Sequence, residues 1–206
     1  MGLMLFQTGF VWILLSIAVY GVIHSILAGL SFKSWVRRQV GEHTYHRFYR
    51  LFFSLQAAVL FLPVLLLVGI LPDQTMYRIS MPWILFTSFI QILAVGFMIH
   101  SVMLTGAMRF VGLQQALDPV SAEHNLPLVR RGLYRYVRHP LYTCTFLVIW
   151  LVPVMSWNVL ALNIGVTLYT LIGAYFEERK LVQEFGATYE SYRKNTPFIV
   201  PFVKFL

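Results

Sequence analysis

The sequence has little charge: only 12% of its 206 residues are Asp, Glu, Lys or Arg, about half the share that is usual in soluble domains. Cysteine occurs once, at Cys144, which excludes a small secreted scaffold held by disulfides. Hydrophobic residues make up 58% of the chain, which excludes intrinsic disorder. A soluble fold of this length cannot bury so much apolar side chain, so the composition predicts one membrane domain, spanning residues 1–206.

Several common signatures are also missing. The sequence contains no phosphate-binding loop, no dinucleotide-binding fingerprint and no nucleophile elbow. Glu42, His43 and His46 would make only a partial metal site, because no third strong ligand lies near them in sequence. We therefore expect no bound metal. The first apolar stretch lacks a basic leading region and is too long for a signal peptide, so we expect it to remain in the membrane.

Long uncharged stretches dominate the sequence. A helix needs about 20 apolar residues to cross the hydrocarbon core of a bilayer. Four stretches without a formal charge reach that length, at residues 2–32, 51–72, 79–108 and 140–176. The last is too long for one span, and Pro153 with the nearby Ser-Trp-Asn run divides it into a tight helical hairpin. The sequence therefore predicts an all-α, polytopic protein with five transmembrane helices.

The cationic residues predict the orientation of these helices. Fifteen of the sixteen Lys and Arg residues lie in segments 33–50, 109–138 and 179–204, and only Arg78 lies on the opposite side. This positive-inside pattern predicts an N-terminus outside and a C-terminus in the cytoplasm, in the inner membrane if the source is bacterial. The net charge of +8 follows from this topology, so the expected partners are membrane lipids and no nucleic acid.

The first cluster of polar residues is segment 130–142, which leads into the fourth span and contains four arginines and three tyrosines besides His139. Pro140 suits the first turn of a helix, because its missing N–H would have no partner there. His139 and the following amides would then lie at a helix N-terminus, which favours anions. The alternative is that the arginines bind lipid phosphates and the tyrosines form an interfacial belt.

The second cluster, Glu177 and Glu178, lies at the end of the fifth span. Glu177 shares a helical stripe with the apolar positions of a predicted amphipathic, cytoplasmic C-terminal helix, whereas Glu178 is rotated off that stripe and is expected to face water or headgroups. A carboxylate on the inward face at a membrane boundary needs a partner. That partner is either an arginine of the other loop or a cationic ligand. The stripe consists of Leu181, Phe185, Tyr189 and Tyr192.

Two histidines lie within predicted spans, and an ionisable residue in a span is a functional candidate. His24 lies near the cytoplasmic end of the first span and His100 near that of the third. The alternative for each is a neutral imidazole hydrogen-bonded to a neighbouring helix, and we prefer this for His100.

The two polar clusters together form a recognisable pair of motifs. Gly-x-Tyr-Arg-Tyr-x-Arg-His-Pro-x-Tyr begins at Gly132, and Glu-Glu-x-x-Leu-x-x-x-Phe-Gly-x-x-Tyr-x-x-Tyr begins at Glu177. Over about residues 128–201 the sequence resembles the isoprenylcysteine carboxyl methyltransferase superfamily of integral-membrane enzymes. Features of the first half, such as His24-Ser25 and Phe32-Lys33, resemble the methanethiol S-methyltransferase branch.

The resemblance implies a methyltransferase that uses S-adenosyl-L-methionine, with the cofactor held by about residues 105–206. Tyr142 and Glu177 would then face each other across one chamber, with Glu177 bound to the methionine ammonium. His24 and Arg138 are the catalytic candidates, because a nearby base or cation would favour the thiolate of a thiol substrate. The implied cofactor-binding residues are Gln115, Leu128, Val129, Tyr134, His139, Pro140, Leu141, Tyr142 and Glu177.

The resemblance leaves the methyl acceptor open. Cys144 replaces a glycine that is usual in the family, and Gly173 replaces an arginine that contacts the substrate in the isoprenylcysteine branch. The missing arginine disfavours a carboxylate substrate and favours a small thiol such as methanethiol, or another lipophilic acceptor. The alternatives are methylation of isoprenylcysteine or of a lipid amine, a sterol-type reductase that needs NADPH, and a non-catalytic membrane subunit that binds lipid headgroups.

Overall fold

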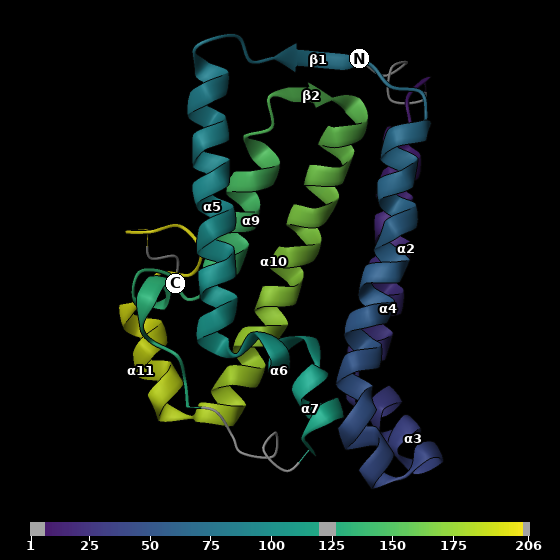
Figure 1. Cartoon of the computed structure of the whole chain (residues 1–206), viewed down its shortest axis with the longest axis vertical. Helices are drawn as coiled ribbons and strands as arrows, with labels where there is room; N and C mark the ends of the chain where they lie inside the picture. The colour runs from purple at the N-terminus through teal and green to yellow at the C-terminus, as the bar shows by residue number, and fades with distance from the viewer. Residues whose placement is uncertain (1–6, 120–126, 204–206) are drawn as a thin grey trace. The chain divides into compact units, whose positions relative to one another are not determined.

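A computed structural model describes residues 7–119 and 127–203. Most of these residues are helical, and they form two compact units (Figure 1). Helix α10 (Trp157–Phe185) contributes to both, because its residues up to Gly165 belong to the first unit and the remainder to the second. Lys204, which the charge pattern includes, lies outside the described residues.

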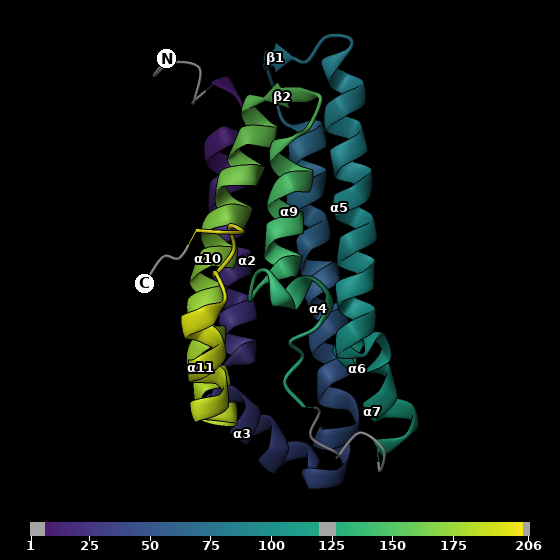
Figure 2. The same ribbon diagram turned by 90° about the vertical axis from the view of Figure 1, so that its left-hand side faces the viewer.

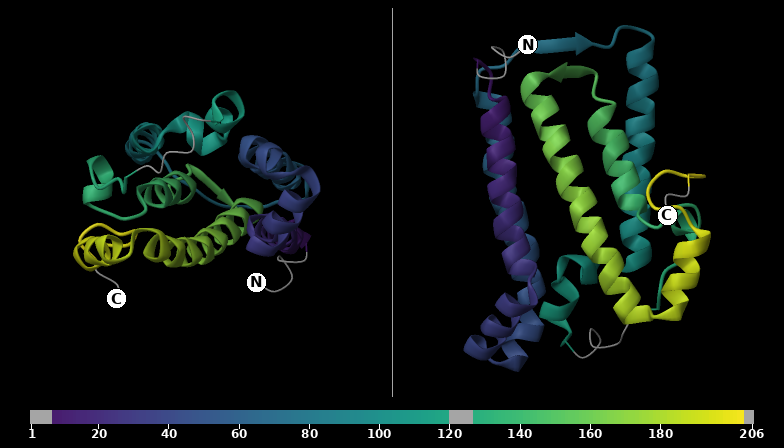
Figure 3. Two further views of the ribbon diagram at one scale, coloured as in Figure 1. Left: turned by 90° about the horizontal axis from the view of Figure 1, so that it is seen from below. Right: turned by 180° about the vertical axis from the view of Figure 1, so that it is seen from behind.

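The first unit is built on a pair of long helices, α2 (Phe10–Ala28) and α4 (Glu42–Ile70), which lie side by side (Figure 3). Its apolar core joins these helices to the start of α10. The side chain of Asn158 donates to the carbonyl of Leu71 at 3.2 Å, which satisfies a carbonyl that has no partner inside the helix at the end of α4. The core residues are Ile13, Ile17, Val64 and Ala161.

Three short helices complete the first unit: α3 (Leu30–Val40), α6 (Ala107–Val111) and α7 (Leu113–Leu117). Arginines of α4 hold the last two, since Arg50 Nε donates to Phe110 O at 3.0 Å and Arg47 Nε to Ala116 O at 2.9 Å. Gly112 separates α6 from α7 with a φ of 96°, and a Cβ there would collide with the backbone of α4. The turn therefore requires glycine.

The second unit is built around α5 (Trp83–Thr105) and α9 (Pro140–Trp150), which pack against each other (Figure 2). Between these helices, Gln91 Nε2 donates to Val148 O at 2.7 Å. A two-stranded sheet of β1 (Thr75–Arg78) and β2 (Val154–Ser156) accompanies them. The prediction of an all-α fold is therefore only broadly correct, because residues expected to form a simple turn between α9 and α10 include a short paired strand.

The last helix of the second unit is α11 (Ala187–Asn195). Gly186 has a φ of 54° between α10 and α11, so the helical stripe that begins on α10 does not continue as one straight helix. Instead α11 turns back from the end of α10 (Figure 3). Tyr189 and Tyr192 are buried as a result.

Four helices are long and apolar enough to cross a membrane, namely α2, α4, α5 and α10. They expose large side chains that lipid would cover, including Trp12, Leu62 and Ile92. The fifth predicted span corresponds to α9, which has 11 residues and a length of about 16 Å. The structure thus describes a mostly helical protein with four candidate membrane spans.

Candidate active site

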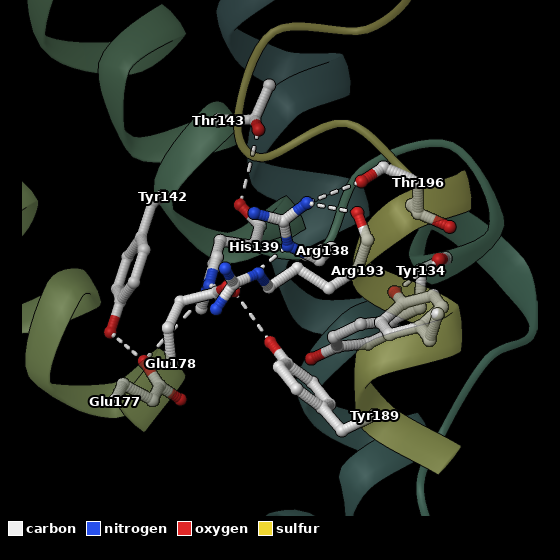
Figure 4. Close-up of polar contacts among 11 residues, drawn as sticks. Tyr134, Arg138, His139, Tyr142, Thr143, Glu177, Glu178, Tyr189, Arg193 and Thr196 are labelled. Carbon is white, nitrogen blue, oxygen red and sulfur yellow. Dashed lines mark hydrogen bonds and ion pairs between the residues drawn. The ribbon is translucent and has the colours of Figure 1, made fainter. Parts of the chain in front are cut away.

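The second unit brings the two polar clusters of the sequence together at the start of α9 (Figure 4). His139 is the N-cap residue of α9 and is buried, and Pro140 occupies the first turn, as the motif predicts. The first intrahelical bond runs from Thr143 N to His139 O at 3.1 Å. The amides of Leu141 and Tyr142 precede that bond, so helix geometry leaves both without an intrahelical acceptor.

Glu178 is the centre of a buried hydrogen-bond network. Its Oε1 accepts from Arg138 Nε at 3.0 Å, from His139 Nε2 at 2.8 Å and from the Tyr189 hydroxyl at 2.6 Å. The residue is only 8% exposed. The prediction that Glu178 faces water or headgroups is therefore wrong. Glu178 is rotated off the stripe of α10, but the helix ends at Gly186, and α11 turns back there and covers Glu178. Arg138 compensates the buried charge.

Glu177 has different surroundings, although it is the adjacent residue. Its Oε2 accepts a hydrogen bond from the Tyr142 hydroxyl at 2.6 Å, so these two side chains face each other (Figure 4). The side chain is 45% exposed, and His139 Nδ1 lies 3.7 Å from Oε2. Among the described residues this is the one ionisable nitrogen within 4.0 Å of the carboxylate. Glu177 is thus a half-open carboxylate beside a helix N-terminus.

The Arg138 side chain is largely buried and links several elements. Besides its bond to Glu178, Nη1 donates to the backbone carbonyls of Arg193 at 3.0 Å and Thr196 at 2.6 Å. The guanidinium carbon also lies 5.4 Å from the centre of the Phe198 ring. Arg138 therefore joins α10 to the segment that follows α11.

That segment also pairs with the start of α9 through its backbone. The bonds run from Arg138 N to Pro197 O (2.8 Å), from His139 N to Phe198 O (3.2 Å) and from Thr143 Oγ1 to Ile199 O (2.6 Å). Sequence reasoning missed residues 196–199, because carbonyl acceptors leave no side-chain pattern. The one available signal is a short apolar run after the charged end of α11.

Three tyrosines of the site keep their hydroxyl protons at neutral pH. Burial, together with the negative charge of Glu177, raises the pKa of Tyr134 to about 12. Burial, followed by the hydrogen-bonded carboxylate of Glu178, raises the pKa of Tyr189. Burial also raises the pKa of Tyr192, whose hydroxyl donates to Tyr134 O at 2.5 Å. Each therefore remains a hydrogen-bond donor.

The remaining predicted site residues lie in several places. Leu128 and Val129 are half-buried in the segment that precedes the 3₁₀ helix η1 (Gly132–Arg135), in the same unit as the motifs. His24 and Gln115 belong to the first unit. There His24 Nδ1 lies 3.2 Å from Gln56 Nε2, and Gln115 Nε2 donates to Arg109 O at 3.3 Å.

The two departures from the family pattern also have defined surroundings. Cys144 is 4% exposed, so its side chain packs inside the second unit. A Cβ added at Gly173 would meet no atom of the described chain within 4 Å. The space for a longer side chain therefore exists one helical turn before Glu177.

Comparison with known proteins identifies the relatives of this chain. A family model described as "Protein of unknown function (DUF1295)" matches residues 31–196. The chain belongs to this family. The methanethiol S-methyltransferase of Pseudomonas deceptionensis is 33% identical over 196 residues, which cover 91% of this chain and 71% of that protein. The methanethiol S-methyltransferase of Mycobacterium tuberculosis is 30% identical over 191 residues, covering 91% and 76%.

A third relative, the methanethiol S-methyltransferase of Crocosphaera subtropica, is 29% identical over 194 residues, covering 91% of this chain and 72% of that protein. No solved structure matches the chain. These relatives confirm the prediction from the motif pair: this DUF1295 member lies in the methanethiol S-methyltransferase branch of the isoprenylcysteine carboxyl methyltransferase superfamily. The family model ends at Thr196, just before the residues that pair with the start of α9.

Proposed function

We propose that this protein is a membrane methyltransferase that uses S-adenosyl-L-methionine to methylate a small thiol, with methanethiol as the model acceptor. The names of its relatives support the acceptor. The observation that carries the proposal is the half-open Glu177 carboxylate, held by Tyr142 beside the N-terminus of α9. A carboxylate at a membrane boundary needs a cationic partner.

The residues of the site fit the amino-acid part of this cofactor. Glu177 would accept hydrogen bonds from the ammonium group, because Arg138 is already bonded to Glu178. The amides of Leu141 and Tyr142 would donate to the carboxylate at the positive end of the α9 dipole. Tyr134 remains protonated, so its uncharged ring would line the site without repelling the carboxylate of the cofactor. Leu128 and Val129 would line the nucleoside, whereas the fully buried Pro140 side chain would act only by fixing the start of α9. Gln115 is a further proposed cofactor residue.

Bound at this site, the cofactor supplies a methyl group that is already activated by its bond to a sulfonium. The thiol loses its S–H proton to a base, the thiolate sulfur forms a new bond to the methyl carbon, and the bond from that carbon to the donor sulfur breaks. The products are a thioether and the demethylated cofactor. The protein's tasks are alignment and exclusion of water, which can contribute several kcal/mol.

We propose His24 as the base or pKa-lowering group for the thiol, since it is an ionisable residue of a membrane span that already has a polar neighbour in Gln56. For Arg138 the contacts favour a different role from direct catalysis. Its Nε and Nη1 are bonded to Glu178 and to two backbone carbonyls, so we assign Arg138 to positioning the site.

We propose five membrane crossings for the whole domain, with the N-terminus outside and α11 in the cytoplasm. From Trp157 to Glu177, α10 rises about 30 Å. Tyr142 is bonded to Glu177, so the two residues lie at the same depth in the membrane. The chain between Tyr142 and Trp157 must therefore cover a similar distance along the membrane normal. The rest of α9 rises about 1.5 Å per residue, and the extended residues around β2 rise about 3.3 Å per residue. Together they are long enough to cover this distance. The thiol then enters from the bilayer and the cofactor from the cytosol.

Two kinds of assay test the proposed function. Headspace mass spectrometry of membranes given S-adenosyl-L-methionine and methanethiol should detect dimethyl sulfide. Thin-layer analysis of lipids after incubation with a labelled methyl donor separates isoprenylcysteine or lipid-amine methylation from thiol methylation. A label found in lipid alone would reject the thiol. A non-catalytic lipid-binding subunit would give neither product.

Calorimetry tests the cofactor site directly. Purified protein in detergent is titrated with S-adenosylhomocysteine, the demethylated product. Glu177→Ala should weaken its binding at least about tenfold, because the ammonium loses a charge-assisted hydrogen bond. Glu184→Ala, which removes an exposed carboxylate from the same helix, is the matched control and should bind as the unmodified protein does. Equal affinity of a folded Glu177→Ala variant would reject the site.

A further inference from the structure

Glu178 has no role in the proposed chemistry, yet it is the most heavily bonded carboxylate among the described residues. Three donors converge on its Oε1, two from the adjacent residues Arg138 and His139 at the start of α9 and one from Tyr189 on α11. Arg138 alone would compensate its charge, so the bond to His139 Nε2 at 2.8 Å is not required for electroneutrality. This second bond determines which nitrogen of the His139 ring carries the proton.

A carboxylate oxygen at 2.8 Å accepts a hydrogen bond and cannot donate one when ionised, so Nε2 must carry a hydrogen. In the neutral imidazole, Nδ1 is then an acceptor. The ring is fixed in place by stacking on Tyr142, with centroids 5.2 Å apart and planes at 12°. The Phe198 ring packs edge-on at 5.0 Å from another direction. Nδ1 consequently lies 3.7 Å from Glu177 Oε2.

We propose that Glu178 is a positioning residue: it holds His139 as the Nε2–H tautomer, so that Nδ1 and Glu177 together form a paired acceptor for the ammonium group of the ligand. The distance of 3.7 Å between the two acceptor atoms is too long for a hydrogen bond between them. It is short enough for one ammonium nitrogen to lie within hydrogen-bond distance of both. This inference rests on the proposed function, because it assigns the ligand's ammonium to Glu177.

The opposite tautomer would disable the site. With a hydrogen on Nδ1, His139 would direct an N–H toward the space beside Glu177 Oε2, 3.7 Å away, and would no longer offer an acceptor there. It would also present a donor to the ammonium, which has only donors. Removal of the Glu178 acceptor therefore affects ligand binding through His139, without any contact between Glu178 and the ligand.

Histidine side-chain nitrogen NMR of the ligand-free, full-length protein tests the tautomer, with His139→Gln used to assign the signals. In the neutral ring of His139, the unmodified protein should carry the proton on Nε2. Glu178→Gln retains an oxygen acceptor and should keep this tautomer. Glu178→Leu removes the acceptor and should move the proton to Nδ1. Tyr189→Phe removes another donor from Glu178 and should leave His139 unchanged.

Calorimetry with S-adenosylhomocysteine completes the test. Glu178→Leu should weaken binding about tenfold, whereas Glu184→Ala should stay within about twofold. If Nδ1 is protonated in the unmodified protein, alone or with Nε2, the inference is wrong even if no Glu178 variant folds. An unchanged tautomer in a folded Glu178→Leu variant also overturns it. Neither result affects the proposed function, which the Glu177→Ala titration and the methylation assays test separately.

Discussion

Tyr189 holds its hydroxyl proton more tightly in the folded protein than in the unfolded chain. The residue is 1% exposed, and its pKa is raised by burial and by the Glu178 carboxylate. A group whose pKa is raised by folding stabilises the fold fully below its unfolded pKa, which is about 10 for tyrosine. That stabilisation is lost as the pH rises from about 10 through the folded pKa.

We expect Tyr189→Phe to destabilise the fold by about 1–3 kcal/mol near neutral pH, because a hydrogen bond to a buried carboxylate is lost. Above about pH 10 the difference in the free energy of unfolding between the variant and the unmodified protein should shrink. Ionisation of Tyr189 then favours the unfolded form of the unmodified protein. Thermal unfolding in detergent at neutral and alkaline pH measures both values. A difference that stays constant with pH would show that the hydroxyl proton contributes nothing.

Gly132 offers a second test at the residue scale. Its φ is 63°, and a Cβ there would lie 2.7 Å from Leu104 Cδ1 on α5. Gly132→Ala should therefore destabilise the protein by about 1–2 kcal/mol through the left-handed backbone alone. Gly96→Ala is the control, because Gly96 lies on α5 with no described atom within 4 Å of a Cβ. Equal unfolding temperatures for the two variants would contradict the argument.

The adjacent carboxylates show what the sequence can and cannot predict about the site. The resemblance to the methyltransferase motifs predicted that Glu177 and Tyr142 face each other, and the hydrogen bond between them agrees with it. The helical stripe predicted only that Glu177 lies on the inward face of its helix. The position of Glu178 could not be predicted in the same way. It depends on how sharply the chain turns at Gly186 and on which backbone carbonyls accept from Arg138, and neither has a periodic signal.

At the scale of elements, the start of α9 depends on the segment that follows α11. Phe198 contacts both His139 and Arg138 through its ring. Phe198→Ala should therefore loosen this segment, destabilise the fold by about 1–3 kcal/mol and weaken S-adenosylhomocysteine binding. Phe202→Ala is a matched control four residues away, because Phe202 is 91% exposed. Limited proteolysis of the C-terminus and calorimetry measure the two effects, and equal behaviour of both variants would refute the coupling.

Long helices with uninterrupted apolar sequence could be predicted, whereas short or irregular elements could not. The uncharged stretches predicted α2, α4, α5 and α10, although α4 begins earlier than its stretch, since Glu42–Arg50 extend the helix with charged turns. The pairing of β1 with β2 was missed, because three- and four-residue strands are too short to show alternation. Pro153 correctly marked the division between α9 and α10, but not the 11-residue length of α9.

At the scale of the whole molecule, the charges and the apolar surface lead to one expectation about topology. Arg38 on α3 and Met76 on β1 lie at opposite ends of α4. Helix α4 has 29 residues and a length of about 43 Å, more than the hydrocarbon core of about 30 Å. If α4 spans the bilayer, these two residues must lie on opposite sides. Because Lys and Arg are in excess on the side of Arg38, we expect that side to be cytoplasmic.

Cysteine labelling can test this arrangement, since Cys144 is the only native cysteine and is replaced by alanine in the parent. In intact cells of a bacterial host, a membrane-impermeant maleimide should label Met76→Cys, whose native residue is 44% exposed. Arg38→Cys should react only after permeabilisation. The reverse pattern would invert the predicted orientation and move Glu177 and the start of α9 away from the cytosolic pool of S-adenosyl-L-methionine. Labelling of both residues in intact cells would instead mean that α4 does not cross the membrane.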